Sequence, residues 1–141
     1  MSCVRDVVHQ RELFSVEENQ SVAEVARKMT DLHVGAILVF NQDQLRGVFS
    51  ERDLLKRVVV ECRDPERTPV SLVMSTDLFM IDESASLEEA MESMQSHNCR
   101  HLPVTCNGRV VAFLSMRELM NFELAQKTEE NQHMRQYISH A

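Results

Sequence analysis

The hydrophobic and polar positions of this chain follow the same order twice. Residues 13–55 align without a gap on residues 78–120. In each copy, a Ser-x-x-Glu motif that begins at Ser21 or Ser86 precedes apolar residues at helical spacing. This combination predicts an amphipathic helix capped by the serine. The chain therefore contains an internal repeat, and each copy contributes one capped helix.

Short apolar runs surround each predicted helix. After it come two runs separated by a polar turn, "AILVF" and "LRGVFS" in the first copy and "HLPVT" and "RVVAFLS" in the second. Such runs predict a strand pair, and a second helix begins at Ser50 or Ser115. Each copy thus predicts the order β-α-β-β-α, a mixed α/β fold class. Because a unit of about 60 residues buries too little apolar surface to be stable alone, we expect the two copies to pack together.

Two changes in composition predict the domain boundaries. The segment "ECRDPERTPVS" combines two prolines with dense charge and predicts a linker around 63–69. We therefore expect a first repeat with its linker at 1–68, a second repeat at 69–122 and a C-terminal tail at 123–141. The tail lacks Gly and Pro, is apolar at Met134, Tyr137 and Ile138, and predicts a helix that docks on another surface.

Composition narrows the class of protein. The 141 residues are 43% hydrophobic and 26% charged, which is ordinary globular usage. A formal net charge of -7 argues against nucleic-acid binding, because such a chain repels a phosphate backbone. No apolar stretch is long enough to cross a bilayer and no signal peptide is visible, so we expect a cytoplasmic protein. The four cysteines form no CxxC pair and are expected to be free thiols.

Polar groups gather where each strand pair gives way to a helix, in "GVFSERDLL" at 47–55 and "AFLSMRELM" at 112–120. The pairs Ser50-x-x-Asp53 and Ser115-x-x-Glu118 have the spacing of a helix capping box. A carboxylate can also accept hydrogen bonds from two neighbouring ribose hydroxyls, and a helix N-terminus favours a phosphate. From the residues alone, both a structural cap and a ligand site remain open.

These motifs, with "VSLVM" at 70–74 and "RHLPV" at 100–104, resemble the tandem cystathionine-β-synthase (CBS) domain pair, or Bateman module. The resemblance covers nearly all of the chain and extends to the small standalone bacterial proteins of this family. It implies two repeats in pseudo-twofold contact, clefts that hold adenosine-containing ligands, and no catalysis. Expected ligands are AMP, ADP, ATP or NAD(H), with S-adenosylmethionine as a further possibility.

The resemblance also implies a set of nucleotide-binding residues. Ser50 and Asp53 are expected to face the ribose, basic side chains the phosphates, and a segment containing Gly35 the base. For the arginines, an ordinary surface role remains an alternative. The full set is His33, Val34, Gly35, Ala36, Ser50, Arg52, Asp53, Arg100, His101, Ser115, Arg117 and Glu118.

The second copy departs from the pattern at two positions, since Ala112 replaces Gly47 and Glu118 replaces Asp53. Glutamate is the preferred capping-box partner, so we expect Glu118 to cap better than Asp53. The shorter Asp53 then leaves more room for a ribose. The Asp53 cleft is therefore predicted to be the tighter adenosine site.

Two other classes of function remain. A ligand-free dimerisation scaffold or stress protein could use the same fold. An enzyme or redox protein could use His97, Cys99, His101 and Cys106, but these residues form no closed set of zinc-type spacings, and no catalytic motif surrounds the thiols. We therefore predict no catalytic or metal-binding residues. The expected partners are a second copy of the chain and an unidentified regulated protein.

Overall fold

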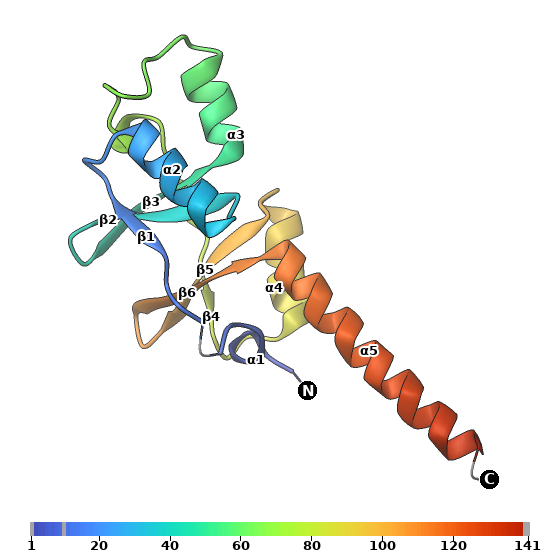
Figure 1. The fold of residues 1–141 in the computed structure, drawn as a ribbon. Helices are drawn as coiled ribbons and strands as arrows, with labels where there is room; N and C mark the ends of the chain where they lie inside the picture. Colours follow the sequence, from blue (N-terminus) through green and yellow to red (C-terminus); the bar gives the residue numbers. More distant parts are fainter. Residues whose placement is uncertain (1, 10, 140–141) are drawn as a thin grey trace.

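Two three-stranded sheets form the framework of the protein (Figure 1). The computed structural model describes residues 2–9 and 11–139, with side chains described as far as residue 132. The first sheet contains β1 (Ser15–Glu17), β2 (Ala36–Asn41) and β3 (Gln44–Ser50), and the second contains β4 (Ile81–Asp82), β5 (His101–Cys106) and β6 (Arg109–Ser115). In both, the first strand is parallel to the middle strand and the last is antiparallel to it. The predicted mixed α/β fold class is confirmed.

The register of the two sheets is the same. The start of β2 lies opposite the end of β3, with Ala36 paired to Ser50. The start of β5 lies opposite the end of β6 in the same way, with His101 paired to Ser115. As a result, the two strand-to-helix junctions are each held against the segment that enters the middle strand of their own sheet.

The two predicted capped helices are present. The first, α2 (Val22–Leu32), begins after Ser21, whose hydroxyl accepts a 3.1 Å hydrogen bond from the backbone of Glu24. The second, α4 (Leu87–Ser96), begins after Ser86 with the equivalent bond of 3.0 Å from Glu89. These hydroxyls satisfy backbone N–H groups that have no partner inside the helix.

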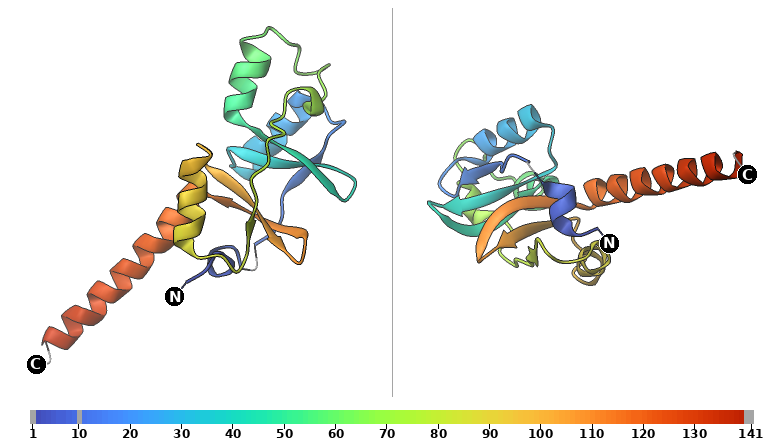
Figure 2. Two further views of the ribbon diagram at one scale, coloured as in Figure 1. Left: turned by 180° about the vertical axis from the view of Figure 1, so that it is seen from behind. Right: turned by 90° about the horizontal axis from the view of Figure 1, so that it is seen from below.

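The helices that follow β3 and β6 differ in length and geometry. The first is a short turn, α3 (Glu51–Asp53), that continues as the π-helical segment η1 (Leu54–Val59). The second is α5 (Met116–Ser139), one continuous helix that contains residues 123–139 of the predicted tail and projects away from both sheets (Figure 2). The side chains of Met134, Tyr137 and Ile138 lie outside the described part of the structure.

The chain segment that precedes each repeat in sequence packs into the hydrophobic core of the other repeat. A short helix that the sequence analysis did not predict, α1 (Val4–Val8), packs against the second sheet, and Val4 N donates a 2.9 Å hydrogen bond to Ala85 O. The 3₁₀ turn η2 (Val70–Leu72) packs in the first core, where Val70 N donates a 2.8 Å bond to Gln20 O. The two halves are therefore intertwined, and each core depends on both.

Candidate functional site

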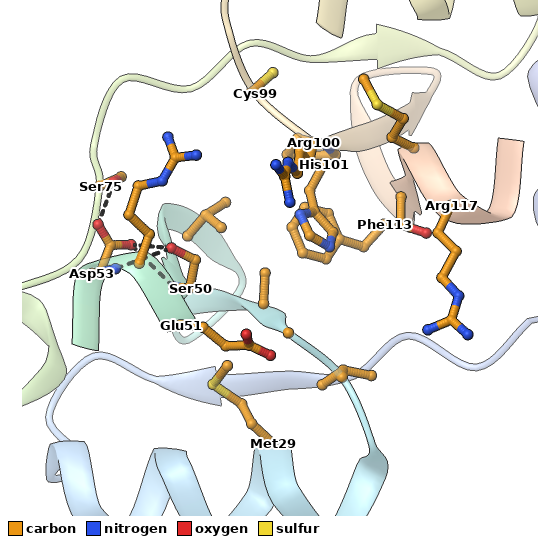
Figure 3. Close-up of a pocket in the computed structure, with 18 of the residues that line it drawn as sticks. Met29, Ser50, Glu51, Asp53, Ser75, Cys99, Arg100, His101, Phe113 and Arg117 are labelled. Carbon is orange, nitrogen blue, oxygen red and sulfur yellow. Dashed lines mark hydrogen bonds between the residues drawn. The ribbon is translucent and has the colours of Figure 1, made fainter. Parts of the chain in front are cut away.

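A groove of about 1540 Å³ runs between the two repeats (Figure 3). All twelve predicted nucleotide-binding residues line it, from both junctions and from the segments that enter β2 and β5. The segments leading into the two repeats also line it, at Arg11 and Ser75. The structure therefore brings together groups from six separate parts of the chain.

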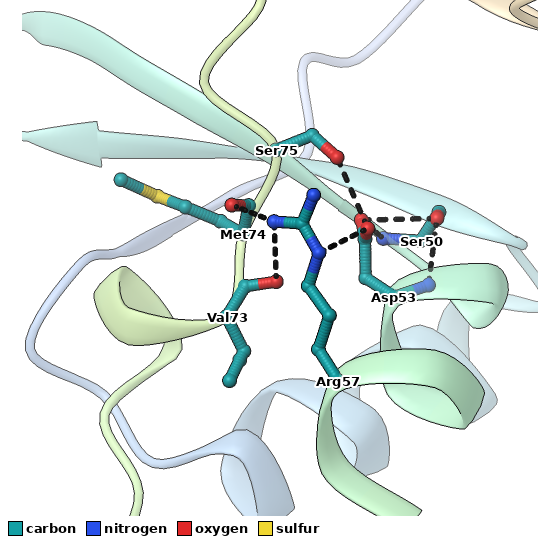
Figure 4. Close-up of polar contacts among 6 residues, drawn as sticks. All are labelled: Ser50, Asp53, Arg57, Val73, Met74 and Ser75. Atoms are coloured by element: carbon teal, nitrogen blue, oxygen red, sulfur yellow. Dashed lines mark hydrogen bonds and ion pairs between the residues drawn. The ribbon is translucent and has the colours of Figure 1, made fainter. Parts of the chain in front are cut away.

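One end of the groove is organised around Asp53, which is only 6% exposed (Figure 4). Its Oδ2 accepts 3.0 Å hydrogen bonds from the backbone N–H and the hydroxyl of Ser50. Its Oδ1 accepts a 3.0 Å hydrogen bond from the hydroxyl of Ser75, in the segment leading into the second repeat. Both carboxylate oxygens thus have protein partners, and the structural cap is fully formed.

Arg57 supports this end from one helical turn further along. Its Nε lies 3.8 Å from Asp53 Oδ1, and its Nη1 donates a 2.7 Å hydrogen bond to the carbonyl of Met74. The guanidinium therefore links η1 to the segment leading into the second repeat, which contains Met74 and Ser75 and is called the inter-repeat segment below. The sequence analysis missed this residue, although its i, i+4 spacing from Asp53 was visible. The equivalent position in the second repeat is Phe122, which cannot play this part.

The other end is organised around Glu118. Its Oε1 accepts a 3.0 Å hydrogen bond from the Ser115 hydroxyl and a 3.3 Å bond from the Ser115 backbone N–H. Asp53 makes the equivalent backbone contact at 3.0 Å, whereas the reciprocal bond from the backbone N–H of the acidic residue to the serine hydroxyl is 3.2 Å at Asp53 and 3.0 Å at Glu118, so both capping boxes are formed and the expected advantage of glutamate does not show in these distances. Both side chains reach back, because the junction backbone brings each carboxylate close to its serine. The second oxygen, Oε2, forms an ion pair with Arg11.

Gly47 explains one difference between the two repeats. The inter-repeat segment pairs with β3, since Val48 and Ser75 exchange backbone hydrogen bonds of 2.9 and 2.8 Å. A Cβ atom at position 47 would lie 2.7 Å from both Met74 Sδ and the Ser75 carbonyl oxygen. Glycine is therefore required where this segment crosses the strand.

Gly35 allows a close approach of a different kind. A Cβ atom there would lie 2.9 Å from the Glu51 carboxylate, and the backbone N–H of Glu51 donates a 3.0 Å hydrogen bond to the Gly35 carbonyl. Glu51 is labelled in the groove in Figure 3 and was not among the predicted site residues. The space above Gly35 is thus partly filled by an acidic side chain that a ligand would meet.

Cationic groups in the groove fall into two sets. Arg11 and Arg57 are paired with the two carboxylates described above. Arg52, Arg100 and Arg117 have no carboxylate oxygen within 4 Å in the described part of the chain. The second set is therefore available to an external anion.

Aromatic rings flank this cationic set. His101 stacks on Phe113 with ring centroids 5.1 Å apart, and burial, together with nearby Arg100, lowers the pKa of the imidazole. Phe79 and His97 also line the groove, and their rings stack with centroids 3.7 Å apart. Burial raises the pKa of the Cys99 thiol, which disfavours a reactive thiolate. Among the side chains that the structure describes, no three of His, Cys, Asp or Glu come together as metal ligands.

Comparison with known proteins identifies the fold. The model of the CBS domain matches the chain twice, at residues 4–60 and 70–125. The chain belongs to the CBS-domain family. CBS domain pairs are regulatory modules, generally without catalytic activity, that often bind adenosine-containing ligands.

Individual relatives agree with this assignment. The CBS domain-containing protein YhcV of Bacillus subtilis is 36% identical over 119 residues, which cover 84% of each chain. The protein YlbB of the same organism is 32% identical, over 78% of this chain and 73% of YlbB. The crystal structure of the CBS-domain containing protein ATU1752 from Agrobacterium tumefaciens superposes with a TM-score of 0.81 at 26% identity, over 86% of this chain and 99% of that one.

Proposed function

We propose that this CBS pair is a sensor that binds an adenosine-containing nucleotide in the groove between its repeats. The observation that carries the proposal is the convergence on one groove of the two carboxylate-capped junctions and of three arginines that form no ion pair with the described residues. A nucleoside phosphate needs acceptors for its ribose hydroxyls and cations for its phosphate, and the groove supplies both. The candidates are AMP, ADP, ATP, NAD(H) and S-adenosylmethionine.

The ribose is assigned to the Asp53 end. A ribose hydroxyl that bonds Asp53 Oδ1 replaces the Ser75 hydroxyl, so binding exchanges one hydroxyl donor for another. The capping contacts from Ser50 reach the other oxygen and can persist. This exchange connects the ligand to the inter-repeat segment, which is the route by which a sensor could report occupancy.

The phosphate is assigned to the arginines. Arg100 lines the same groove as Asp53 and Ser75 (Figure 3), whereas the lowered pKa of its neighbour His101 disfavours a cationic imidazole there. Arg52 and Arg117 occupy equivalent places in the two repeats and line the same groove. Planar guanidinium groups can each grip two phosphate oxygens, which favours phosphorylated ligands over adenosine.

A thermal-shift screen tests the proposal. The purified chain is heated with AMP, ADP, ATP, NADH and S-adenosylmethionine at several concentrations. A ligand that binds the folded state raises the melting temperature in a concentration-dependent way. If none of the five does so at millimolar concentration, the ligand-free scaffold becomes the better account of the fold.

We also propose that the module forms a homodimer in the cytoplasm and acts on a regulated protein. Exposed apolar side chains occupy equivalent positions on the helices that follow β3 and β6. Leu55 and Met120 are 59% and 55% exposed, and Val59 and Leu124 are 61% and 65% exposed. An isologous dimer buries such a repeated pair twice. As for a membrane, no described helix has the length and apolar character of a span.

A further inference from the structure

The Glu118 end of the groove carries an ion pair that has no equivalent at the Asp53 end. Arg11, in the segment leading into the first repeat, meets Glu118 Oε2 at the start of α5. That oxygen is buried and accepts no hydrogen bond from the described residues, so Arg11 is its one charged partner in this part of the chain. The residue equivalent to Arg11 in the second repeat is the uncharged Thr76.

Arg11 has room to leave this position. Its side chain is about half exposed and lines both the main groove and a second cavity of about 180 Å³. The two cavities share Val8, Arg11 and Ala112, so the guanidinium stands at the boundary between them. Partly exposed ion pairs contribute little free energy, and a competing partner can therefore displace the arginine.

We propose that Arg11 makes the Glu118 end selective for phosphorylated nucleosides. In the free protein Arg11 occupies the carboxylate oxygen that a ribose would need. When a nucleoside phosphate enters, the guanidinium moves to the phosphate and the ribose hydroxyls take its place on Glu118. An unphosphorylated nucleoside must break the same ion pair, but it has no phosphate with which the displaced Arg11 guanidinium could pair. This inference rests on the proposed nucleotide function and adds to it a residue that determines specificity.

The test compares AMP with adenosine by titration calorimetry. Both ligands are titrated into the Asp53→Asn chain, in which the other end is weakened, and into the same chain carrying Arg11→Gln. Arg109→Gln is the matched control, because Arg109 is exposed on β6 and lies outside the groove. The series is repeated without the Asp53 change, so that a folding defect in that background cannot decide the result.

We expect Arg11→Gln to weaken AMP binding by about tenfold or more, through loss of a charged hydrogen bond. Adenosine binding should become tighter by roughly two- to fivefold, because the competing ion pair is gone. The control should change neither value. In a Glu118→Gln chain, Arg11→Gln should no longer improve adenosine binding.

Two results would overturn the inference. If AMP binds but its preference over adenosine is the same with and without Arg11, the role assigned to Arg11 is wrong while the nucleotide function stands. If neither ligand binds the wild-type chain or any variant, the nucleotide function itself is wrong and the role of Arg11 falls with it.

Discussion

Ser75 Oγ donates a 3.0 Å hydrogen bond to Asp53 Oδ1, so the segment that leads into the second repeat is fastened to the helix start that ends the first. The contact joins a predicted ligand-binding carboxylate to the connection between the two halves. Asp53 therefore has a structural role, through this contact, in addition to its proposed role in ligand binding. The first prediction separates these two parts.

Replacing Asp53 with alanine should cost both stability and affinity. The change leaves the hydroxyls of Ser50 and Ser75 without their acceptor, so we expect the free energy of unfolding to fall by about 2 kcal/mol. Glu118→Ala should cost about 1 kcal/mol, mainly through the cap contact. Urea denaturation measures both values. Equal losses in the two variants would contradict the added weight given to the Ser75 contact.

Gly47→Ala should destabilise the protein by about 1 to 3 kcal/mol, because the new methyl group would overlap the Ser75 carbonyl and the Met74 sulfur. Gly35→Ala is the matched control. Its methyl group would meet only the end of the Glu51 side chain, which can swing aside, so its cost should be below about 1 kcal/mol. Denaturation of the two variants under one condition decides the matter. If the Gly35→Ala variant is less stable than the Gly47→Ala variant, then the close contact of the inter-repeat segment with β3 is not what requires glycine at position 47.

Because each core contains residues from the segment that precedes the opposite repeat, a substitution in that segment should destabilise the repeat that is more distant in sequence. Val4 precedes the first repeat but is fully buried in the second core, so Val4→Ala should destabilise by about 2 kcal/mol. Val70→Ala should cost a similar amount in the first core. Hydrogen exchange should show the loss in β5 and β6 for Val4→Ala and in β2 and β3 for Val70→Ala. The reverse assignment would count against the exchange of segments.

The free energy of unfolding should decrease as pH is lowered, because His101 is harder to protonate in the folded state than in the unfolded chain. Burial and Arg100 lower the pKa of this imidazole in the folded state, whereas the unfolded value is about 6.5. Between these two values the unfolded chain binds more protons, so the contribution is complete above about pH 6.5 and is lost as pH falls towards the folded pKa. His101→Gln should therefore flatten the dependence of the unfolding free energy on pH between about 7.5 and 5.5.

Arg100→Gln serves as the control for this pH dependence. It removes the smaller of the two causes and leaves burial in place, so part of the slope should remain. The measurement is the urea midpoint at a series of pH values for the wild type and both variants. A His101→Gln profile as steep as that of the wild type would show that other groups control this pH range.

The proposed dimer can be tested on the repeated apolar pair. Val59→Glu and Leu124→Glu place a charge at equivalent exposed positions, and we expect each to weaken association. Val111→Glu is the control, since Val111 is an exposed apolar residue on β6 outside both helices. Truncation after Phe122 asks whether the projecting part of α5 contributes. Sedimentation of a wild-type chain that is monomeric at micromolar concentration would remove the basis for this proposal.

Much of the fold could be predicted because the signals were local and occurred twice. Ser21 and Ser86 marked the helix starts, and the apolar runs around the polar turns marked the strand pairs. The helix at Val4–Val8 was missed because five residues carry too little periodicity, and its stability comes from a core distant in sequence. The π-helical geometry of η1 likewise left no mark in the sequence.

The candidate site was predictable in its two junction carboxylates but not in all of its members or in its contacts. The repeated junction motifs led to Asp53 and Glu118, and the groove contains both. Their partners Ser75 and Arg11 lie in the segments that lead into the opposite repeats, so only the intertwined packing brings them close. The reach of a carboxylate also depends on the backbone of its junction, which is why the predicted difference in capping did not appear.

Titration calorimetry of an adenine nucleotide against the wild-type, Asp53→Ala and Glu118→Ala chains tests the central claim most directly. Hydrogen bonds to a charged group contribute about 1.5 to 3 kcal/mol, so Asp53→Ala should weaken binding by roughly tenfold to a hundredfold, while Glu118→Ala should have the smaller effect. If Asp53→Ala binds as tightly as the wild type and Glu118→Ala abolishes binding, the assignment of the tighter adenosine site to Asp53 is contradicted.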